Sequence, residues 1–210
     1  LIACGVAASF HFLVREEKAA TSTRFFVKPD KALLQLGILA FCCMICEGAM
    51  FDWSGIYFQK VVRADKNWVG AGYTAFMCAM ASGRFVADWV ANLLKFRKTI
   101  FFSGLLIATG LLVAVLFPLV SSSIAGFLLV GFGVSSVIPL IYSEAGKSRT
   151  ISPSMALTAV SSIGFLGFLV GPPMIGMIAG AFSLRVSFVL IALIGLLIAA
   201  IIRSTKAATT

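Results

Sequence analysis

The sequence consists of long apolar runs separated by short polar loops. Six runs are each at least 20 residues long, at 32–58, 68–94, 99–120, 124–143, 154–180 and 182–202. About 20 residues of α-helix cross the ~30 Å hydrocarbon core of a bilayer. Backbone groups in that core must be hydrogen-bonded within the protein, and barrel strands would instead show alternating segments of about 10 residues. The sequence therefore predicts an all-α, polytopic membrane helical bundle.

A seventh apolar stretch, residues 1–14, is too short to span a bilayer. We interpret it as a truncated transmembrane helix, because the chain begins inside an apolar run without a Met or a signal-peptide pattern. The expected organisation is then this stub, a cytoplasmic linker at 15–31, a six-helix unit at 32–202 and a cytoplasmic tail at 203–210.

The charge distribution sets an expected orientation. Twelve of the 17 Lys and Arg residues lie in loops on one side of the predicted bundle. Loops rich in these residues face the cytoplasm, so the linker and the tail are expected inside the cell's inner membrane. Trp53, Tyr57 and Trp68 are then expected at the outer interface. The net charge of +9 does not indicate nucleic-acid binding, because the basic residues form no continuous patch.

The cysteines do not form a metal-binding pattern. Cys43 and Cys46 make a C-x-x-C pair, but the chain has no second pair and its single histidine, His11, is distant in sequence. A zinc site needs about four ligands. We therefore expect neither a metal nor a cofactor, and an enzyme is disfavoured because no catalytic set of residues is present.

Glu47 is the acid that the predicted spans bury most deeply. It lies about 22 Å from the start of its helix, past the middle of the membrane. A carboxyl group at that depth usually faces a cavity or a partner. Glu47 is therefore a candidate for the substrate or proton site, or else a structural acid bonded to a neighbouring helix. Asp52, about 140° further around the helix, is a second candidate unless it lies in the interface.

A charged motif lies at the end of the second predicted span and in the turn before the third. The segment 83–88 contains Arg84 and Asp88, and the basic turn Lys95-Phe96-Arg97-Lys98 follows. This pattern resembles the signature loop of the major facilitator superfamily. Segments 47–54, 144–147, 153–157 and 171–176 are in turn similar to the YbjJ-like and fucose-permease-like branch of that family.

The resemblance implies both a fold and a function. The chain would be the carboxy-terminal six-helix half of a secondary transporter, which moves a small solute by alternating access coupled to protons. A polar inner face with Glu47 and Gln35 would meet a missing amino-terminal half. By the same similarity, a gate network would form at the cytoplasmic end from Arg84, Asp88, Arg97, Lys98 and Glu144. The alternative is surface charges that only set topology.

The fifth span has the sequence features of a bending or packing element. Small residues at four-residue spacing allow close helix contact, and two prolines remove backbone donors. The residues concerned are Gly167, Gly171, Pro172, Pro173, Gly176 and Gly180.

Two further functions remain open at the sequence level. The chain could be a half-size protein that works as a homodimeric transporter or channel, or a transport-dead membrane scaffold or receptor.

Overall fold

The computed structural model describes residues 31–148 and 150–204, and within them the chain is a bundle of helices. The predicted stub, the linker before Lys31 and the last part of the tail lie outside the described residues. The predicted all-α bundle is confirmed. Its elements are α2 (Lys31–Tyr57), the π-helical turn η2 (Phe58–Val62), the 3-10 turn η3 (Lys66–Trp68), α3 (Ala71–Leu116), α4 (Val120–Ser135), α5 (Val137–Ala145), α6 (Pro153–Ala181) and α7 (Leu184–Ser204).

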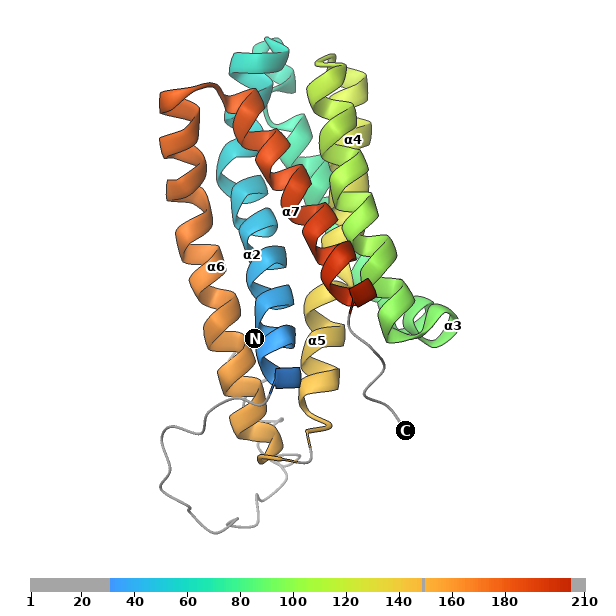
Figure 1. Ribbon diagram of the computed structural model, residues 1–210. Helices are drawn as coiled ribbons and strands as arrows, with labels where there is room; N and C mark the ends of the chain where they lie inside the picture. Colours follow the sequence, from blue (N-terminus) through green and yellow to red (C-terminus); the bar gives the residue numbers. More distant parts are fainter. Residues whose placement is uncertain (1–30, 149, 205–210) are drawn as a thin grey trace, which may run out of the picture.

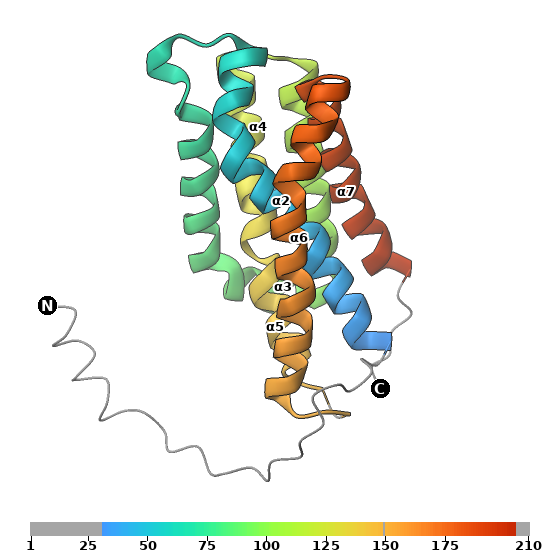
Figure 2. The same cartoon turned by 90° about the vertical axis from the view of Figure 1, so that its left-hand side faces the viewer.

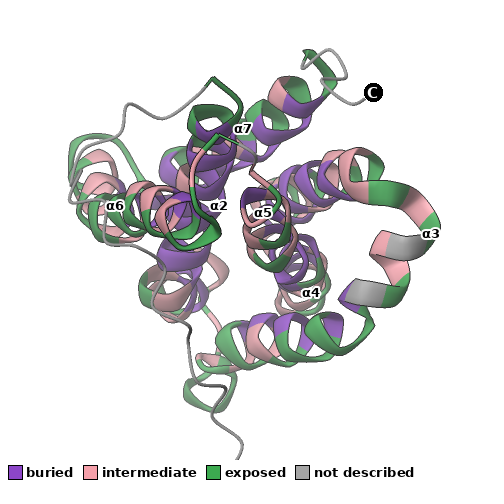
Figure 3. Ribbon diagram, turned by 90° about the horizontal axis from the view of Figure 1, so that it is seen from below, coloured by how far each residue is buried: buried purple, intermediate pink, exposed green. Residues whose placement is uncertain are grey.

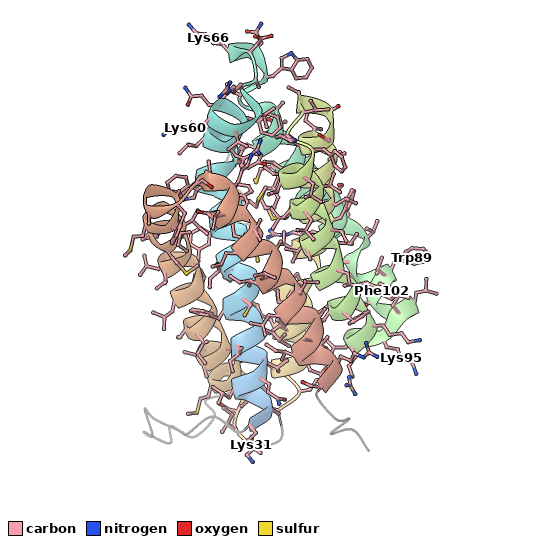
Figure 4. All side chains as sticks on the ribbon, turned by 45° about the horizontal axis from the view of Figure 1, so that its top comes forward. Lys31, Lys60, Lys66, Trp89, Lys95 and Phe102 are labelled. Carbon is pink, nitrogen blue, oxygen red and sulfur yellow. The ribbon has the colours of Figure 1, made fainter. Side chains whose placement is uncertain are left out.

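The helices run up and down between two ends of the bundle (Figures 1 and 2). Figure 4 labels Lys31 and Lys95 at the lower end and Lys60 and Lys66 at the upper end. We call these the Lys95 end and the Lys60 end. The turn between α5 and α6 and the end of α7 also lie at the Lys95 end, whereas the turn between α6 and α7 lies at the Lys60 end.

Helix α3 reverses direction at Lys95, so it is two antiparallel helices joined by a tight turn. The backbone of Lys95 is non-helical, with φ 62° and ψ 155°. The reversal lies at the start of the basic turn that the sequence places at 95–98. Residues 71–94 and the stretch after Lys95 therefore correspond to two successive predicted spans.

Five helices in the described residues are long and apolar enough to cross a membrane. They are Lys31–Val62, Leu93–Leu116, Val120–Ala145, Pro153–Ala181 and Leu184–Ser204. The predicted span at 68–94 is helical from Ala71 but is not among the five. Arg84, Asp88 and Asn92 lower the hydropathy of this segment.

Glycines bring α6 into direct backbone contact with α2. A Cβ atom at Gly167 would overlap the carbonyl of Phe41, and one at Gly171 would lie 3.2 Å from the carbonyl oxygen of Ile45. Without a hydrophobic driving force in lipid, helices associate through such close packing. Similar contacts join α3 to α4 and to α7, at Gly110–Gly126 and Gly104–Gly195.

The predicted fourth span is interrupted, as Gly131, Gly133 and Pro139 suggest. Helix α4 ends at Ser135 and α5 begins at Val137. Pro139 has no N–H to donate to the carbonyl of Ser135, one turn earlier. The Ser135 hydroxyl instead donates to the carbonyl of Phe132, at 2.7 Å. The break divides this span into a 16-residue and a 9-residue helix.

Tyr57 lies in the core and not at the interface where the sequence analysis placed it. Its side chain is fully buried, its ring stacks on Phe188 at 4.3 Å, and its hydroxyl donates to the carbonyl of Ala114 at 2.9 Å. Phe127 packs against both rings. One tyrosine thus contacts α3, α4 and α7, because a buried hydroxyl needs a hydrogen-bond partner and the core supplies one.

Seen from below, buried residues face the middle of the bundle and exposed residues face outward (Figure 3). Large apolar side chains are exposed on residues 71–94 and on α6, including Phe85 (89% exposed) and Leu169 (71% exposed). Such a surface is expected for helices that contact lipid or another apolar surface.

The close approach of α6 to α2 predicts a position-dependent effect of adding one methyl group. Gly167→Ala should lower the thermal unfolding temperature, with a loss of about 1–3 kcal/mol from overpacking. Gly180→Ala is the matched control on the same helix, since a Cβ there meets nothing within 4 Å. Scanning fluorimetry in detergent would measure both variants. Equal unfolding temperatures for the two would contradict the packing role of Gly167.

Candidate substrate site

Glu47 is buried inside the bundle, in the second half of α2. It is 7% exposed and lies within an unbroken run of buried residues, Cys42–Met50. Small side chains dominate this run, so the neighbouring helices approach closely and leave little space for water. An acid in such surroundings needs a partner that offsets the loss of hydration.

The partner of Glu47 is Arg84, on residues 71–94 of α3. Arg84 Nη2 lies 3.4 Å from Glu47 Oε1, which is longer than the 2.7–2.9 Å usual for a charge-assisted hydrogen bond. The two side chains differ in exposure, at 10% for Glu47 and 51% for Arg84. The pair therefore consists of an enclosed carboxylate and a half-exposed guanidinium in loose contact.

Side chains from three elements interact with this ion pair. Met80, one turn before Arg84, contributes its sulfur at 3.7 Å from Arg84 Nη2. Tyr142, on α5 beyond the helix break, and Cys43, on α2, lie within electrostatic reach of the Glu47 carboxyl. Tyr142 belongs to the second half of the interrupted span, so α5 also contributes an electrostatic interaction with the acid.

The sequence left open a bond from Glu47 to a neighbouring helix, but it assigned Arg84 to the gate network and did not identify it as the partner of Glu47. Depth along the helices is the signal that could have revealed it. Glu47 lies ~24 Å from Lys31 and Arg84 lies ~16 Å from Lys95, at the same end of the bundle. A long arginine side chain can bridge much of the remaining difference.

Arg97 and Glu144, which were also assigned to the gate network, have separate partners in the described contacts. Arg97 Nη2 donates to the carbonyl oxygens of Ile202 (3.0 Å) and Arg203 (3.4 Å), at the end of α7. Glu144 pairs with Lys147, three residues along the chain, at 3.0 Å. Lys98 is exposed, and the side chain of Asp88 lies outside the described residues.

Two other candidate polar residues of α2 are exposed rather than buried. Gln35 lies near the Lys95 end. Asp52 lines a mainly apolar groove of about 470 Å³, together with Pro172 and Pro173 of α6. Helix α6 continues through both prolines, and Trp53 Nε1 donates to the carbonyl of Pro172 at 3.1 Å. Asp52 and Glu47 therefore do not share one site.

The remaining glycines of α6 differ in their surroundings. A Cβ at Gly176 would lie 3.0 Å from the Trp53 ring, whereas one at Gly180 would meet nothing within 4 Å. Of Gly176 and Gly180, only Gly176 therefore lies close to another helix. Among residues 31–148 and 150–204, no group of three His, Cys, Asp or Glu side chains is arranged to hold a metal ion.

Residues 1–149 match the family model described as Major Facilitator Superfamily. Membrane protein MosC of Rhizobium meliloti is 38% identical to the chain over 167 residues, which cover 80% of this chain and 41% of MosC. An uncharacterised MFS-type transporter of Yersinia pestis is 35% identical over 179 residues, covering 85% of this chain and 47% of that protein. The chain thus spans less than half the length of these relatives.

Solved structures show the same fold. A crystal structure of a mutant of peptide transporter POT in complex with sulfate superposes with a TM-score of 0.75 at 18% identity. The match covers 86% of this chain and 38% of that protein. A second structure of POT in complex with sulfate gives a TM-score of 0.71 at 20% identity, with the same coverage.

The geometry of the ion pair predicts energetic coupling between Glu47 and Arg84. A double-mutant cycle with Glu47→Gln and Arg84→Gln should give a coupling of about 1 kcal/mol in the free energy of unfolding, since the carboxylate is buried and the guanidinium is half screened. Glu144 and Lys147, an exposed pair on one turn, are the matched control and should give about 0.3 kcal/mol. Additive effects at Glu47 and Arg84 would show that the contact is not stabilising.

Proposed function

Because the chain belongs to the major facilitator superfamily, we propose that it forms the carboxy-terminal half of a secondary transporter. The complete protein would move a small solute across the membrane by alternating access, coupled to protons. The observation that supports this most directly is the ion pair between the enclosed Glu47 and the half-exposed Arg84. Charged groups within membrane helices are costly, and they commonly mark substrate or proton pathways.

The lengths of the relatives support the proposal of a half-transporter. The chain covers 41% and 47% of the two curated relatives, and 38% of the peptide transporter. Transporters of this family pair two six-helix halves around a central site. The missing partner would then be an amino-terminal six-helix half, with the solute bound between the halves.

Glu47 is proposed as the residue that links proton binding to transport. A protonated Glu47 would no longer attract Arg84, whose side chain is already half exposed. The guanidinium would then be available to an anionic group of the solute or to an acid on the other half. Proton binding at one residue could thus change the charge that the inner face presents.

The charges at the Lys95 end are proposed as a latch between access states. Arg97 already connects the start of the second half of α3 to the end of α7. Asp88, Lys98 and Glu144 would complete the network in one access state, by similarity to the family. The proposed orientation places this end, the linker at 15–31 and the carboxy-terminus in the cytoplasm, with the bundle in the inner membrane. The YbjJ-like and fucose-permease-like branch is the proposed subgroup.

A homodimer of half-size chains is the second candidate, and a transport-dead scaffold or receptor is the third. The exposed apolar surface of residues 71–94 could also serve a dimer. The half-transporter is preferred because the relatives named above are about twice as long as the matched region.

Neutralising Glu47 should uncouple transport from the proton gradient. In proteoliposomes of the protein expressed from its full coding sequence, small solutes would first be screened for gradient-driven accumulation. Glu47→Gln should then abolish accumulation but preserve exchange of labelled for unlabelled solute, because binding remains while the proton site is lost. Asp65→Asn, an exposed acid at the Lys60 end, is the control. Full accumulation by Glu47→Gln would contradict the coupling role.

The half-transporter proposal also predicts the behaviour of residues 1–210 alone. These residues should be inactive in liposomes and poorly stable, because the polar groups of the inner face would contact lipid. Co-expression with the upstream six-helix half should restore uptake. A stable dimer of residues 1–210 with specific uptake would instead support the homodimer.

A further inference from the structure

A cavity of about 760 Å³ lies at the Lys60 end, remote from the Glu47–Arg84 pair. It is bounded by the end of α2 with η2, by the end of α6 and by the start of α7. Gly176, Ala179 and Gly180 form its α6 wall, and the two glycines leave space that larger side chains would fill. The cavity therefore lies where three elements meet at one end of the membrane-spanning bundle.

Three cationic side chains line this cavity, namely Lys60, Arg63 and Arg185. They come from different parts of the chain and are brought together by the turn after α2 and the turn before α7. No acidic side chain lines the cavity, and no ion pair within the described residues involves any of the three. Like charges at one site repel, so this arrangement is favourable when an anion lies between them.

The backbone at Arg63 is held in a conformation that arginine rarely adopts. Its φ is 54° and its ψ is 41°, in the left-handed region. The Arg63 N–H donates to the carbonyl of Phe58 and closes the π-helical turn. The end of α6 and the start of α7 also meet here, and their opposite dipoles offset each other. The positive potential of the cavity therefore comes from side chains.

An apolar groove continues from the cavity along the side of the bundle. The groove, of about 470 Å³, shares Trp53 and Ile56 with the cavity. Its other walls are Phe168, Leu169, Pro172 and Pro173, with Asp52 as the one acid. Trp53 is fixed at the junction by its hydrogen bond to Pro172, at 3.1 Å. Tryptophan is favoured at the depth of lipid headgroups.

We propose that the cavity and groove together bind an anionic phospholipid from the leaflet that surrounds the Lys60 end. The phosphate lies among Lys60, Arg63 and Arg185, and one acyl chain follows the groove past Trp53. A soluble anion would use the cationic cavity alone, whereas a phospholipid uses the charge and the adjoining apolar surface. Basic pockets between membrane helices on the cytoplasmic side bind anionic headgroups, and the same charge attraction acts on a basic pocket at the opposite end.

Quenching of Trp53 by brominated lipids tests this site directly. The protein, expressed from its full coding sequence and keeping Trp53 as its sole tryptophan, would be placed in phosphatidylcholine vesicles. Brominated phosphatidylglycerol should quench Trp53 more strongly than brominated phosphatidylcholine at equal mole fraction. Replacing Lys60, Arg63 or Arg185 by Gln should each reduce the preference for phosphatidylglycerol by about fivefold, the effect of one cation at a membrane surface.

The control is Lys66→Gln, since Lys66 is an exposed cation at the same end that does not line the cavity. It should leave the preference unchanged. Equal quenching by the two lipids, or an equal effect of Lys66→Gln, would overturn the proposal. Release of quenching by millimolar inorganic phosphate would also overturn it, by assigning the cavity to a soluble anion. The three cavity variants alter exposed side chains, and size-exclusion chromatography would verify that they fold.

Discussion

The lack of water in the hydrocarbon core of a bilayer is the constraint on which this structure depends. Each backbone must satisfy its own hydrogen bonds there, which makes the spans helical. Without water there is also no hydrophobic effect to drive the helices together. Van der Waals contact between closely approaching backbones must stabilise their association instead. Glycines provide it where α6 meets α2 and where α3 meets α4 and α7. Side-chain hydrogen bonds between helices also go largely to backbone carbonyls, as those of Tyr57 and Trp53 do.

The same constraint explains why Glu47 and Arg84 lie together. An isolated carboxylate would be costly at this depth, and a nearby guanidinium reduces that cost. A buried ion pair does not need to increase the stability of a protein, because replacing such a pair with apolar residues is often neutral or stabilising. The pair is loose at 3.4 Å, so it stabilises the bundle only modestly. Stability alone therefore gives little reason for an ion pair at this position.

The sequence was sufficient to predict where the helices lie along the chain, but it was insufficient to predict which side chains contact each other between helices. The length of the apolar runs predicted the helical spans, and the basic residues at 95–98 predicted the turn between two of them. Both features depend on local composition. The break between α4 and α5 occurs where Pro139 lacks a backbone donor. Partners of side chains depend on how the helices are rotated and tilted, which local composition does not specify. Tyr57 was therefore assigned to the interface although it is fully buried, and Arg84 was assigned to a gate although it reaches Glu47.

Unequal exposure within the ion pair indicates which member can change partner. Glu47 lies on α2, which α6 holds through the backbone contacts at Gly167 and Gly171, so the carboxylate is fixed relative to the core. Arg84 lies on residues 71–94, whose outer side chains Phe85 and Trp89 are 89% and 68% exposed. A segment with so much exposed surface has fewer contacts to lose when it shifts. A change of partner at this site is therefore easiest through movement of Arg84 away from a stationary Glu47, and not through movement of α2.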